Sequence, residues 1–354
     1  MKNMEKYLSI LGQEADGLLL TSRYSRHYSA EFDIAEGVAV VSKAGCRYFT
    51  DSRYIESAQA SIKGFQVLEM NLANPYNQLI NQAISDFGIT KLGFEEDYLS
   101  VAELMDYQKN LNTQLIPMNA QIHGFRAVKE EWELERMRKA QDITDKAFGE
   151  ILARIQPGMT EKELQAELIY CLYKNGADGP AFSPIVVSGP NTSMPHGVAG
   201  DRVICRGDFV TMDFGAAYQG YCSDMTRTVA VGFATEEMEK VYNTVLQAQL
   251  AGIAVSKAGV AGEDIDGAAR KVITDAGYGA YFGHGYGHCL GMEIHENPRC
   301  AIGWDTVMEE NMVSSAEPGI YLPGKFGVRI EDVLIFKAGG YENITHSPKN
   351  LIIV

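Results

Sequence analysis

The sequence lacks a long apolar run, an excess of basic residues and any close pairing of cysteines. No stretch approaches the roughly 18 apolar residues that a bilayer-spanning helix requires, so we expect no membrane segment. The formal net charge of -15 argues against a nucleic-acid partner, because phosphate binding requires a basic surface. The acidity is spread along the chain, with no long acidic tail.

The opening MKNMEKYLSILGQEADG also lacks the pattern of an export signal, because charges interrupt its short apolar stretches. The six cysteines are scattered without CxxC spacing, so we interpret them as reduced thiols of a cytoplasmic protein. Two of them, Cys222 and Cys289, lie near the acidic residues discussed below. Those acids favour a hard metal ion over a thiolate site.

A chain of 354 residues exceeds the usual span of one hydrophobic core, so we expect two domains, residues 1–124 and 125–354. The first alternates short β-rich runs with a helical pattern, which predicts a small α/β domain. Its strands are expected at residues 16–22, 36–50 (a hairpin turning at 43–45), 65–70 and 91–96, with a helix near 75–87.

The second domain repeats one pattern loosely. A helical section at 129–175 precedes an acidic hairpin, and a second helical section at 235–276 precedes another. The first section opens with a charged amphipathic helix that we expect to end at Pro157 and Gly158. The repeat therefore places two acidic hairpins in matching positions.

The first hairpin, VTMDFGAAYQGYCSDMTRTVA, carries two aspartates in strand-forming sequence. If its turn centres on Tyr218 and Gln219, Asp213 and Asp224 face each other across the ladder. Directly opposed like charges destabilise a sheet, by on the order of 4 kcal/mol at about 4 Å and an effective dielectric near 20. Either one aspartate caps a turn while the other is solvated, or a cation lies between them.

The second hairpin, EPGIYLPGKFGVRIEDVLIF, carries Glu317 and Glu331 around a turn near residues 323–325. Four carboxylates on two paired hairpins would repel one another unless something cationic lay among them. Arg227 and Arg329 are near enough in sequence to form a structural salt-bridge cluster. A divalent metal is the alternative, because oxygen-rich sites suit Mg, Mn and related ions.

A cluster of histidines lies between the two hairpins, in GHGYGHCLGMEIHENP at residues 283–298. His284 and His288 have the spacing of two ligands on a helix, but the surrounding glycines disfavour a helix and no HExxH is present. The glycines do not indicate a nucleotide-binding loop either, since no strand-loop-helix unit frames them. With His295 in the same run and His196 in SMPHGVAG, the clustering favours a site over isolated structural histidines.

In this order, VTMDFGAAYQGYCSDMTRTVAVG, GHGYGHCLGMEIHE and EPGIYLPGKFGVRIEDV resemble the metallopeptidase family of prolidase and aminopeptidase P. The resemblance covers essentially the whole chain and includes TDSRYIESA at residues 50–58, which is similar to a creatinase-type N-terminal domain. It implies an α+β architecture. A small creatinase-like α/β domain would precede a catalytic domain with the pita-bread fold of methionine aminopeptidases, built on a pseudo-twofold repeat.

The resemblance also implies a set of metal ligands, with none of the family's five substituted. Asp224 and Glu331 would bridge two divalent ions, most simply Mn²⁺ or Co²⁺. Asp213 would complete the shell of one ion, and His288 and Glu317 that of the other. Two such ions lower the pKa of a shared water and orient the resulting hydroxide towards a carbonyl.

Roles for the remaining site residues follow from the same resemblance. Glu317 would accept the proton of the attacking water and pass it to the leaving nitrogen. His196 and His295 would contact substrate and stabilise the developing oxyanion. His284 matches a third histidine of the pocket. Arg329 would orient a metal ligand or contact the substrate. Phe182 and Ile294 match residues that line an apolar pocket for proline, or they simply pack in the core.

Two activities of the family remain open. Prolidases cut Xaa-Pro dipeptides, and aminopeptidase P removes the first residue from longer peptides that begin Xaa-Pro. A cation that captures the free carboxylate of a dipeptide should discriminate between them. Arg299 is the only basic residue between His295 and Glu317, and it is either that clamp or a solvated loop arginine.

Three rival interpretations remain. A metal-free creatinase-like hydrolase lacks the ligand set, and a non-catalytic member that binds partner proteins would be expected to have lost ligands. A methionine aminopeptidase would lack the N-terminal 120 residues or so. The resemblance further implies a homodimer, in which the N-terminal domain of one chain walls the active site of its neighbour.

Overall fold

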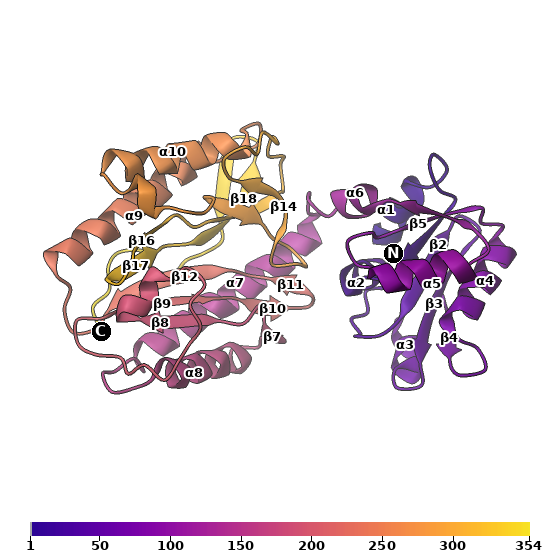
Figure 1. Cartoon of the computed structure of the whole chain (residues 1–354), viewed down its shortest axis with the longest axis horizontal. Coiled ribbons are helices and arrows are strands. Elements are labelled where there is room, and N and C mark those ends of the chain that lie inside the picture. The colour runs from indigo at the N-terminus through magenta and orange to yellow at the C-terminus, as the bar shows by residue number, and fades with distance from the viewer. Residues whose placement is uncertain (1) are drawn as a thin grey trace. The chain divides into compact units, whose positions relative to one another are not determined.

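The computed structural model describes residues 2–354, which form two compact units, one ending at Arg126 and one beginning at Ala127 (Figure 1). Among the described residues, every helix is too short or too polar to cross a lipid bilayer.

The first unit is built on a mixed six-stranded sheet with the order β4-β3-β2-β1-β5-β6. The predicted strands are confirmed, and the expected hairpin turns at Lys43 and Ala44 because Ser42 pairs with Gly45. Apolar side chains of the strands pack with Ile80 and Ile84 of the predicted helix to form the core. The strands are β1 (Gly17–Leu20), β2 (Val38–Ser42), β3 (Gly45–Asp51), β4 (Gln66–Met70), β5 (Lys91–Phe94) and β6 (Gln114–Pro117). The helices are α1 (Lys2–Ser9), α2 (Arg23–Ala30), α3 (Ile55–Ser61), α4 (Tyr76–Phe87), α5 (Val101–Asn110) and α6 (Asn119–Gly124).

The second unit consists of two similar halves, each with a pair of long helices packed on antiparallel strands. One hydrophobic core joins the first pair of helices to the strands of the first half, and another joins the second pair of helices to the strands of the second half. Figure 1 shows the two helix pairs on opposite sides of this unit with the strands between them. The pseudo-twofold repeat of an α+β, pita-bread arrangement is thereby confirmed.

The four long helices of this unit are α7 (Glu131–Leu152), α8 (Glu161–Lys174), α9 (Glu236–Val255) and α10 (Gly262–Asp275), and η1 (Gly189–Ser193) and η2 (Gly279–Tyr281) are short 3-10 turns. The strands of the first half are β7 (Gly179–Pro180), β8 (Ile185–Ser188), β9 (Phe209–Phe214), β10 (Ala216–Tyr218), β11 (Tyr221–Cys222) and β12 (Met225–Ala230). Those of the second half are β13 (Gly287–Cys289), β14 (Glu296–Cys300), β15 (Val313–Ala316), β16 (Gly319–Leu322), β17 (Phe326–Arg329), β18 (Asp332–Lys337) and β19 (Gly340–Asn343).

The end of helix α7 differs from the prediction. The helix stops at Leu152, before Pro157 and Gly158 are reached. Its last turn tightens, because the backbone N–H of Arg154 bonds the carbonyl of Ile151, three residues earlier. Ile155 then leaves the helical path and is buried in the core with α8. Tertiary packing, and not the proline, ends this helix.

The predicted register of the first acidic hairpin is wrong by two residues. Tyr218 pairs with Tyr221, so the turn consists of Gln219 and Gly220, which have φ values of 48° and 82°. Two-residue hairpin turns favour this left-handed pair, because its twist matches that of the strands, and Gly220 adopts it without strain. Asp213 therefore pairs with Thr226, and Asp224, which directly precedes the strand of Thr226, is the diagonal neighbour of Asp213. The two carboxylates still share one face of the sheet.

The position opposite Asp224 is occupied by Gly215, since the adjacent pair is Phe214 with Met225. A Cβ atom on Gly215 would lie 1.8 Å from the carbonyl oxygen of Ser223, so no other residue fits there without moving the chain. The second hairpin agrees with the prediction. Leu322 pairs with Phe326 across residues 323–325, and the ladder closes at Gly319 with Arg329, which leaves Glu317 and Glu331 just beyond it.

Candidate active site

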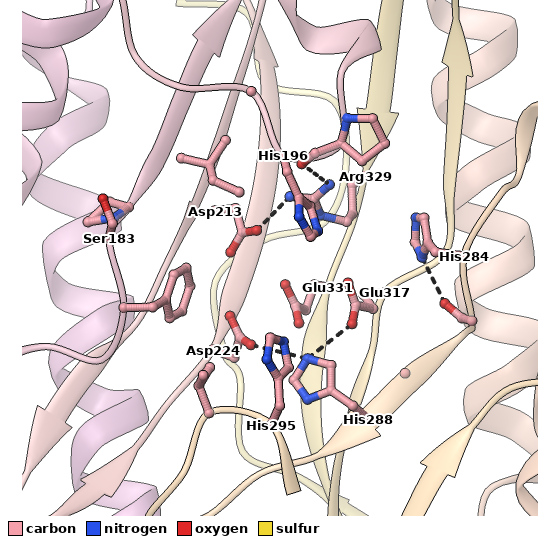
Figure 2. Close-up of a pocket in the computed structure, with 18 of the residues that line it drawn as sticks. Ser183, His196, Asp213, Asp224, His284, His288, His295, Glu317, Arg329 and Glu331 are labelled. Carbon is pink, nitrogen blue, oxygen red and sulfur yellow. Dashed lines mark hydrogen bonds and ion pairs between the residues drawn. The ribbon is translucent and has the colours of Figure 1, made fainter. Parts of the chain in front are cut away.

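A cavity of about 600 Å³ in the second unit is lined by all the residues to which the resemblance assigns a role in the site (Figure 2). The hairpins of both halves contribute, as do the loop before β9 and the β13 to β14 segment. The sequence-predicted lining residues are Phe182, His196, Asp213, Asp224, His284, His288, Ile294, His295, Arg299, Glu317, Arg329 and Glu331.

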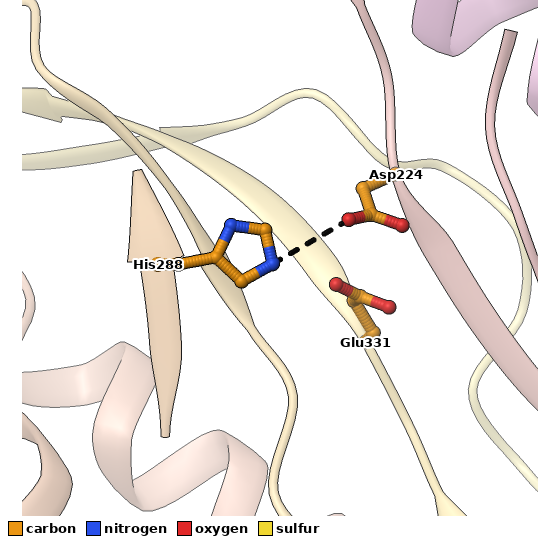
Figure 3. A group of neighbouring side chains, drawn as sticks. All are labelled: Asp224, His288 and Glu331. Carbon is orange, nitrogen blue, oxygen red and sulfur yellow. Dashed lines mark ion pairs between the residues drawn. The ribbon is translucent and has the colours of Figure 1, made fainter. Parts of the chain in front are cut away.

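Three of these side chains approach closely enough to hold one ion (Figure 3). One ligand atom each from Asp224, His288 and Glu331 lies within 4.8 Å of the others, and all three residues are buried. The Nε2 atom of His288 lies 3.6 Å from Oδ2 of Asp224 and 3.2 Å from Oε1 of Glu317. Segments far apart in sequence thus converge on one point.

The tautomer of His288 follows from its other contact. Its Nδ1 atom lies 3.1 Å from the carbonyl oxygen of Cys289, which can only accept a hydrogen bond, so Nδ1 carries the proton. In the neutral ring this leaves the lone pair of Nε2 directed at the carboxylates. A backbone carbonyl that orients a ligating histidine in this way is a recurrent feature of metal sites.

Three carboxylate oxygens at this point are buried and have no hydrogen-bond partner. They are Oδ1 of Asp213, Oδ1 of Asp224 and Oε1 of Glu331. Buried polar atoms are normally satisfied, and a buried charge requires compensation. Unpartnered oxygens next to an imidazole lone pair fit the ligand chemistry of divalent metal ions.

The electrostatics of these side chains lead to the same conclusion. Burial, followed by repulsion from neighbouring carboxylates, raises the pKa values of Asp224 and Glu331 well above their usual range. Burial alone would also raise the pKa of Glu317, but the hydrogen bond and charge of His288 lower it to about 2. Two of the four carboxyls therefore favour the protonated form unless a cation lies beside them.

This arrangement predicts that metal uptake releases protons. Divalent cations ligate carboxylates, so binding must deprotonate Asp224 and Glu331, whose raised pKa values favour the protonated form in the metal-free protein. We expect a net release of protons on metal binding near neutral pH. Calorimetric titration with Mn²⁺ in buffers of different ionisation enthalpy measures this number. Identical binding heats in all buffers would show that the carboxyls are already ionised.

Arginine compensates only part of this charge. Arg329 donates from Nη2 to Oδ2 of Asp213 at 2.6 Å. Arg227 instead pairs with Asp332 at 2.8 Å and donates to the backbone carbonyl of Glu331. The purely structural salt-bridge cluster weighed above thus accounts for one of the four carboxylates.

The sequence analysis missed two residues that complete this network, Tyr321 and Thr226. Arg329 donates to the Tyr321 hydroxyl at 2.9 Å, and that hydroxyl lies 2.8 Å from Nε2 of His284. Since Nδ1 of His284 faces the carbonyl of Gly285, Nε2 accepts the proton of Tyr321. Strand alternation places Tyr321 on the same face as Glu317, and that was the only signal available.

Thr226 links the two hairpins. Its hydroxyl accepts from Nε of Arg329 at 3.0 Å and donates to Oε2 of Glu331 at 2.7 Å. Because the guanidinium is only a donor, the single hydroxyl proton of Thr226 must point to Glu331. This contact leaves Oε1 as the unpartnered oxygen of Glu331.

The outer histidines line the cavity from exposed positions. The ring of His295 packs edge-on against that of His288, with centroids 4.4 Å apart, and burial with the charge of His288 lowers the pKa of His295. A neutral imidazole there can donate or accept one hydrogen bond. Arg299, also exposed, lies on β14 directly opposite His288 of β13.

Comparison with known proteins adds an independent finding. Residues 135–338 match the model of metallopeptidase family M24, and residues 8–128 match the creatinase/prolidase N-terminal domain. The chain is 40% identical to the peptidase YqhT of Bacillus subtilis strain 168, over 99% of both chains.

Two solved structures share the entire architecture. A Xaa-Pro dipeptidase from Bacillus anthracis superposes with a TM-score of 0.96 at 42% identity, covering 100% of this chain and 99% of that one. An X-Pro aminopeptidase from Thermotoga maritima gives a TM-score of 0.94 at 35% identity, with 99% of each chain covered. The expected fold class, a creatinase-like domain followed by a pita-bread domain, is thereby confirmed.

Proposed function

The chain belongs to metallopeptidase family M24, and we propose that it hydrolyses the bond before proline in Xaa-Pro dipeptides or at the N-terminus of short Xaa-Pro peptides. The observation that carries this proposal is the convergence of Asp213, Asp224, Glu331 and Glu317 with His288 on the floor of one cavity. The rival of a non-catalytic binding protein has no support, since both solved relatives named above are peptidases.

Divalent metal ions are the cofactors of this family, and their number and identity here are part of the proposal. We assign two ions, with Asp224 and Glu331 as ligands common to both. Asp213 would serve one ion, and His288 and Glu317 the other. The ligands are carboxylate oxygens and one imidazole, which favours Mn²⁺ or Co²⁺.

When bound, the ions would supply an activated water and polarise the substrate carbonyl. Glu317 lines the same cavity, and its carboxylate would accept the proton of the attacking water. That proton would then pass to the leaving nitrogen of proline. His196 and His295 enter the same cavity and would hydrogen-bond the substrate as negative charge develops on its carbonyl oxygen.

The cavity also offers an apolar wall for the proline ring. Phe182 and Ile294 are half-buried and line it. A proline nitrogen carries no N–H when it forms a peptide bond, so recognition by backbone hydrogen bonding is weak and ring shape must contribute. Turnover of Ala-Pro and Ala-Pro-Ala against Ala-Ala and Ala-Ala-Ala by Mn²⁺-loaded protein tests the proposal. Equal rates with and without proline would refute proline selectivity, and no turnover of any of the four peptides would refute the function.

Arg299 is the proposed determinant of peptide length. Replacing it with methionine removes a cation that could bind the free carboxylate of a dipeptide. Such charge-assisted bonds contribute about 1.5–3 kcal/mol, so kcat/KM for Ala-Pro should fall about 10- to 100-fold. The rate for Ala-Pro-Ala, whose carboxylate lies one residue further out, should change little. Arg206→Met, at another exposed arginine that does not line the cavity, is the control.

Equal losses for the two substrates would show that Arg299 does not bind the carboxylate.

We further propose a cytoplasmic homodimer, in which all six cysteines remain as the free thiols that the structure contains. Sizing of the native protein measures the association state.

A further inference from the structure

A buried carboxylate outside the cavity ties together both ends of the loop that carries His196. Glu161 is the first residue of α8, and its side chain is fully buried. Its Oε1 atom accepts from the backbone N–H of Ser188 at 2.7 Å, from the Ser188 hydroxyl at 2.9 Å and from Nδ2 of Asn191 at 3.0 Å. Its Oε2 atom accepts from the backbone N–H of Gly200 at 3.0 Å.

The segment closed by these bonds is the His196 loop, residues 189–200, which leaves β8 and passes through η1. One carboxylate therefore spans its start and its end. The backbone N–H of Lys162 reinforces the closure by donating to the carbonyl of Gly200 at 3.2 Å. Pro195, His196 and Val198 lie between the anchors and line the cavity.

The opposite side of the His196 loop is attached to the second hairpin. The backbone N–H of Gly327 donates to the Thr192 hydroxyl at 2.8 Å, and Arg329 donates to the carbonyl of Pro195 at 3.2 Å. A Cβ atom on Gly327 would lie 2.2 Å from the Thr192 carbonyl oxygen, so the contact is close. The loop is held between α8 of one half and β17 of the other, beside the metal ligands.

Glu161 is not needed to begin its own helix. Thr160 and Glu163 already form a complete capping box, with the Glu163 carboxylate accepting from the Thr160 N–H at 2.7 Å. Burying a carboxylate is costly even when it is paired, so a buried charge contributes little to stability by itself. The Glu161 carboxylate instead fixes the geometry of the loop, because it accepts hydrogen bonds from four donors at the two ends of the loop.

We propose that Glu161 is a positioning residue that fixes the His196 loop and thereby aims the His196 imidazole at the substrate. The proposal rests on the function proposed above, because it takes His196 as a residue that contacts the reacting carbonyl. Glu161 does not touch the metal ligands, so its role is separable from metal binding.

The direct test is Glu161→Gln. A glutamine amide can accept through one atom only, so its NH2 group must face either the backbone N–H of Ser188 or the backbone N–H of Gly200, and the hydrogen bond from that N–H is lost. We expect kcat for Ala-Pro to fall at least about tenfold, since misplacement by about 1 Å costs up to about a hundredfold. The Mn²⁺ affinity measured by calorimetry should not change, and amide hydrogen exchange should accelerate in residues 189–200. Glu163→Gln, which removes the same charge two residues away, should leave kcat and exchange of the loop unchanged.

A double-mutant cycle with His196→Ala separates positioning from general destabilisation. If Glu161 acts through His196, adding Glu161→Gln to His196→Ala should cause no further loss of kcat. Additive losses, or an unchanged kcat in Glu161→Gln alone, would overturn the proposal while the peptidase function stands. An active His196→Ala variant would overturn both this proposal and the assigned role of His196. Should Glu161→Gln not fold, Asn191→Ala removes one of the four donors and takes its place in the same cycle, with a smaller loss expected.

Discussion

Replacement of Asp224 by asparagine, or of Glu331 by glutamine, is expected to abolish hydrolysis while the protein remains folded. Each residue is assigned as a ligand common to both ions, so its loss should remove the pair and not a single contact. Folding should persist because burial, and then repulsion from neighbouring carboxylates, raises the pKa of both carboxyls and so disfavours their charged form, and a neutral amide carries no such charge. The metal-free variants should therefore be no less stable than the metal-free wild type.

The same variants have a second expected signature in thermal unfolding. A ligand at about a hundredfold above its Kd stabilises the folded state by about 2.7 kcal/mol. In a unit of this size that corresponds to roughly 5–10 °C in melting temperature. Mn²⁺ should raise the melting temperature of the wild type by this amount and that of either variant far less. Asp201→Asn, at an exposed aspartate, is the control for charge removal.

Full activity of either variant in a metal-replete assay would refute the assignment of two ions with shared ligands. If a variant kept its activity but was no longer stabilised by Mn²⁺ against thermal unfolding, the metal would have a structural role only.

Removal of the metal by a chelator is expected to inactivate the enzyme completely, and Mn²⁺ or Co²⁺ should restore it. The metal supplies the activated water, and three carboxylate oxygens at the site are buried without a hydrogen-bond partner in the described structure. The two hydrophobic cores of the second unit lie beneath the helix pairs, so the metal-free protein should keep its helical circular dichroism.

The measurement is the Ala-Pro rate after chelation, gel filtration and addition of one metal at a time. Full recovery with Zn²⁺ alone would contradict the argument from hard oxygen ligands. Activity that survives exhaustive chelation would contradict metal dependence altogether.

Much of the site was predictable because it places acidic and histidine side chains in strand-forming sequence, where they are uncommon. Carboxylates such as Asp213 and Glu331 are rare in buried strands, and histidines as close as His288 and His295 are rare in a chain with few of them. The direct opposition of Asp213 and Asp224 was predicted wrongly, because the position of a two-residue turn depends on which residues adopt a left-handed conformation. Gln219 does so here although glutamine has no local preference for it.

The supporting residues were not predictable for a different reason. Thr226 and Tyr321 are ordinary strand residues until Arg329 lies beside them. Glu161 resembles any acidic residue in the first turn of a helix, and its partners come 27 to 39 residues later in the chain. Roles that arise only from tertiary contacts leave no local pattern to read.

Anomalous diffraction at the manganese edge, from crystals grown with Mn²⁺, tests the central claim most directly. Two peaks should appear a few Å apart, with Asp224 and Glu331 contacting both, Asp213 contacting one, and His288 and Glu317 the other. The absence of any peak at these side chains, or a lone peak with Asp213 still held by Arg329, would contradict the account.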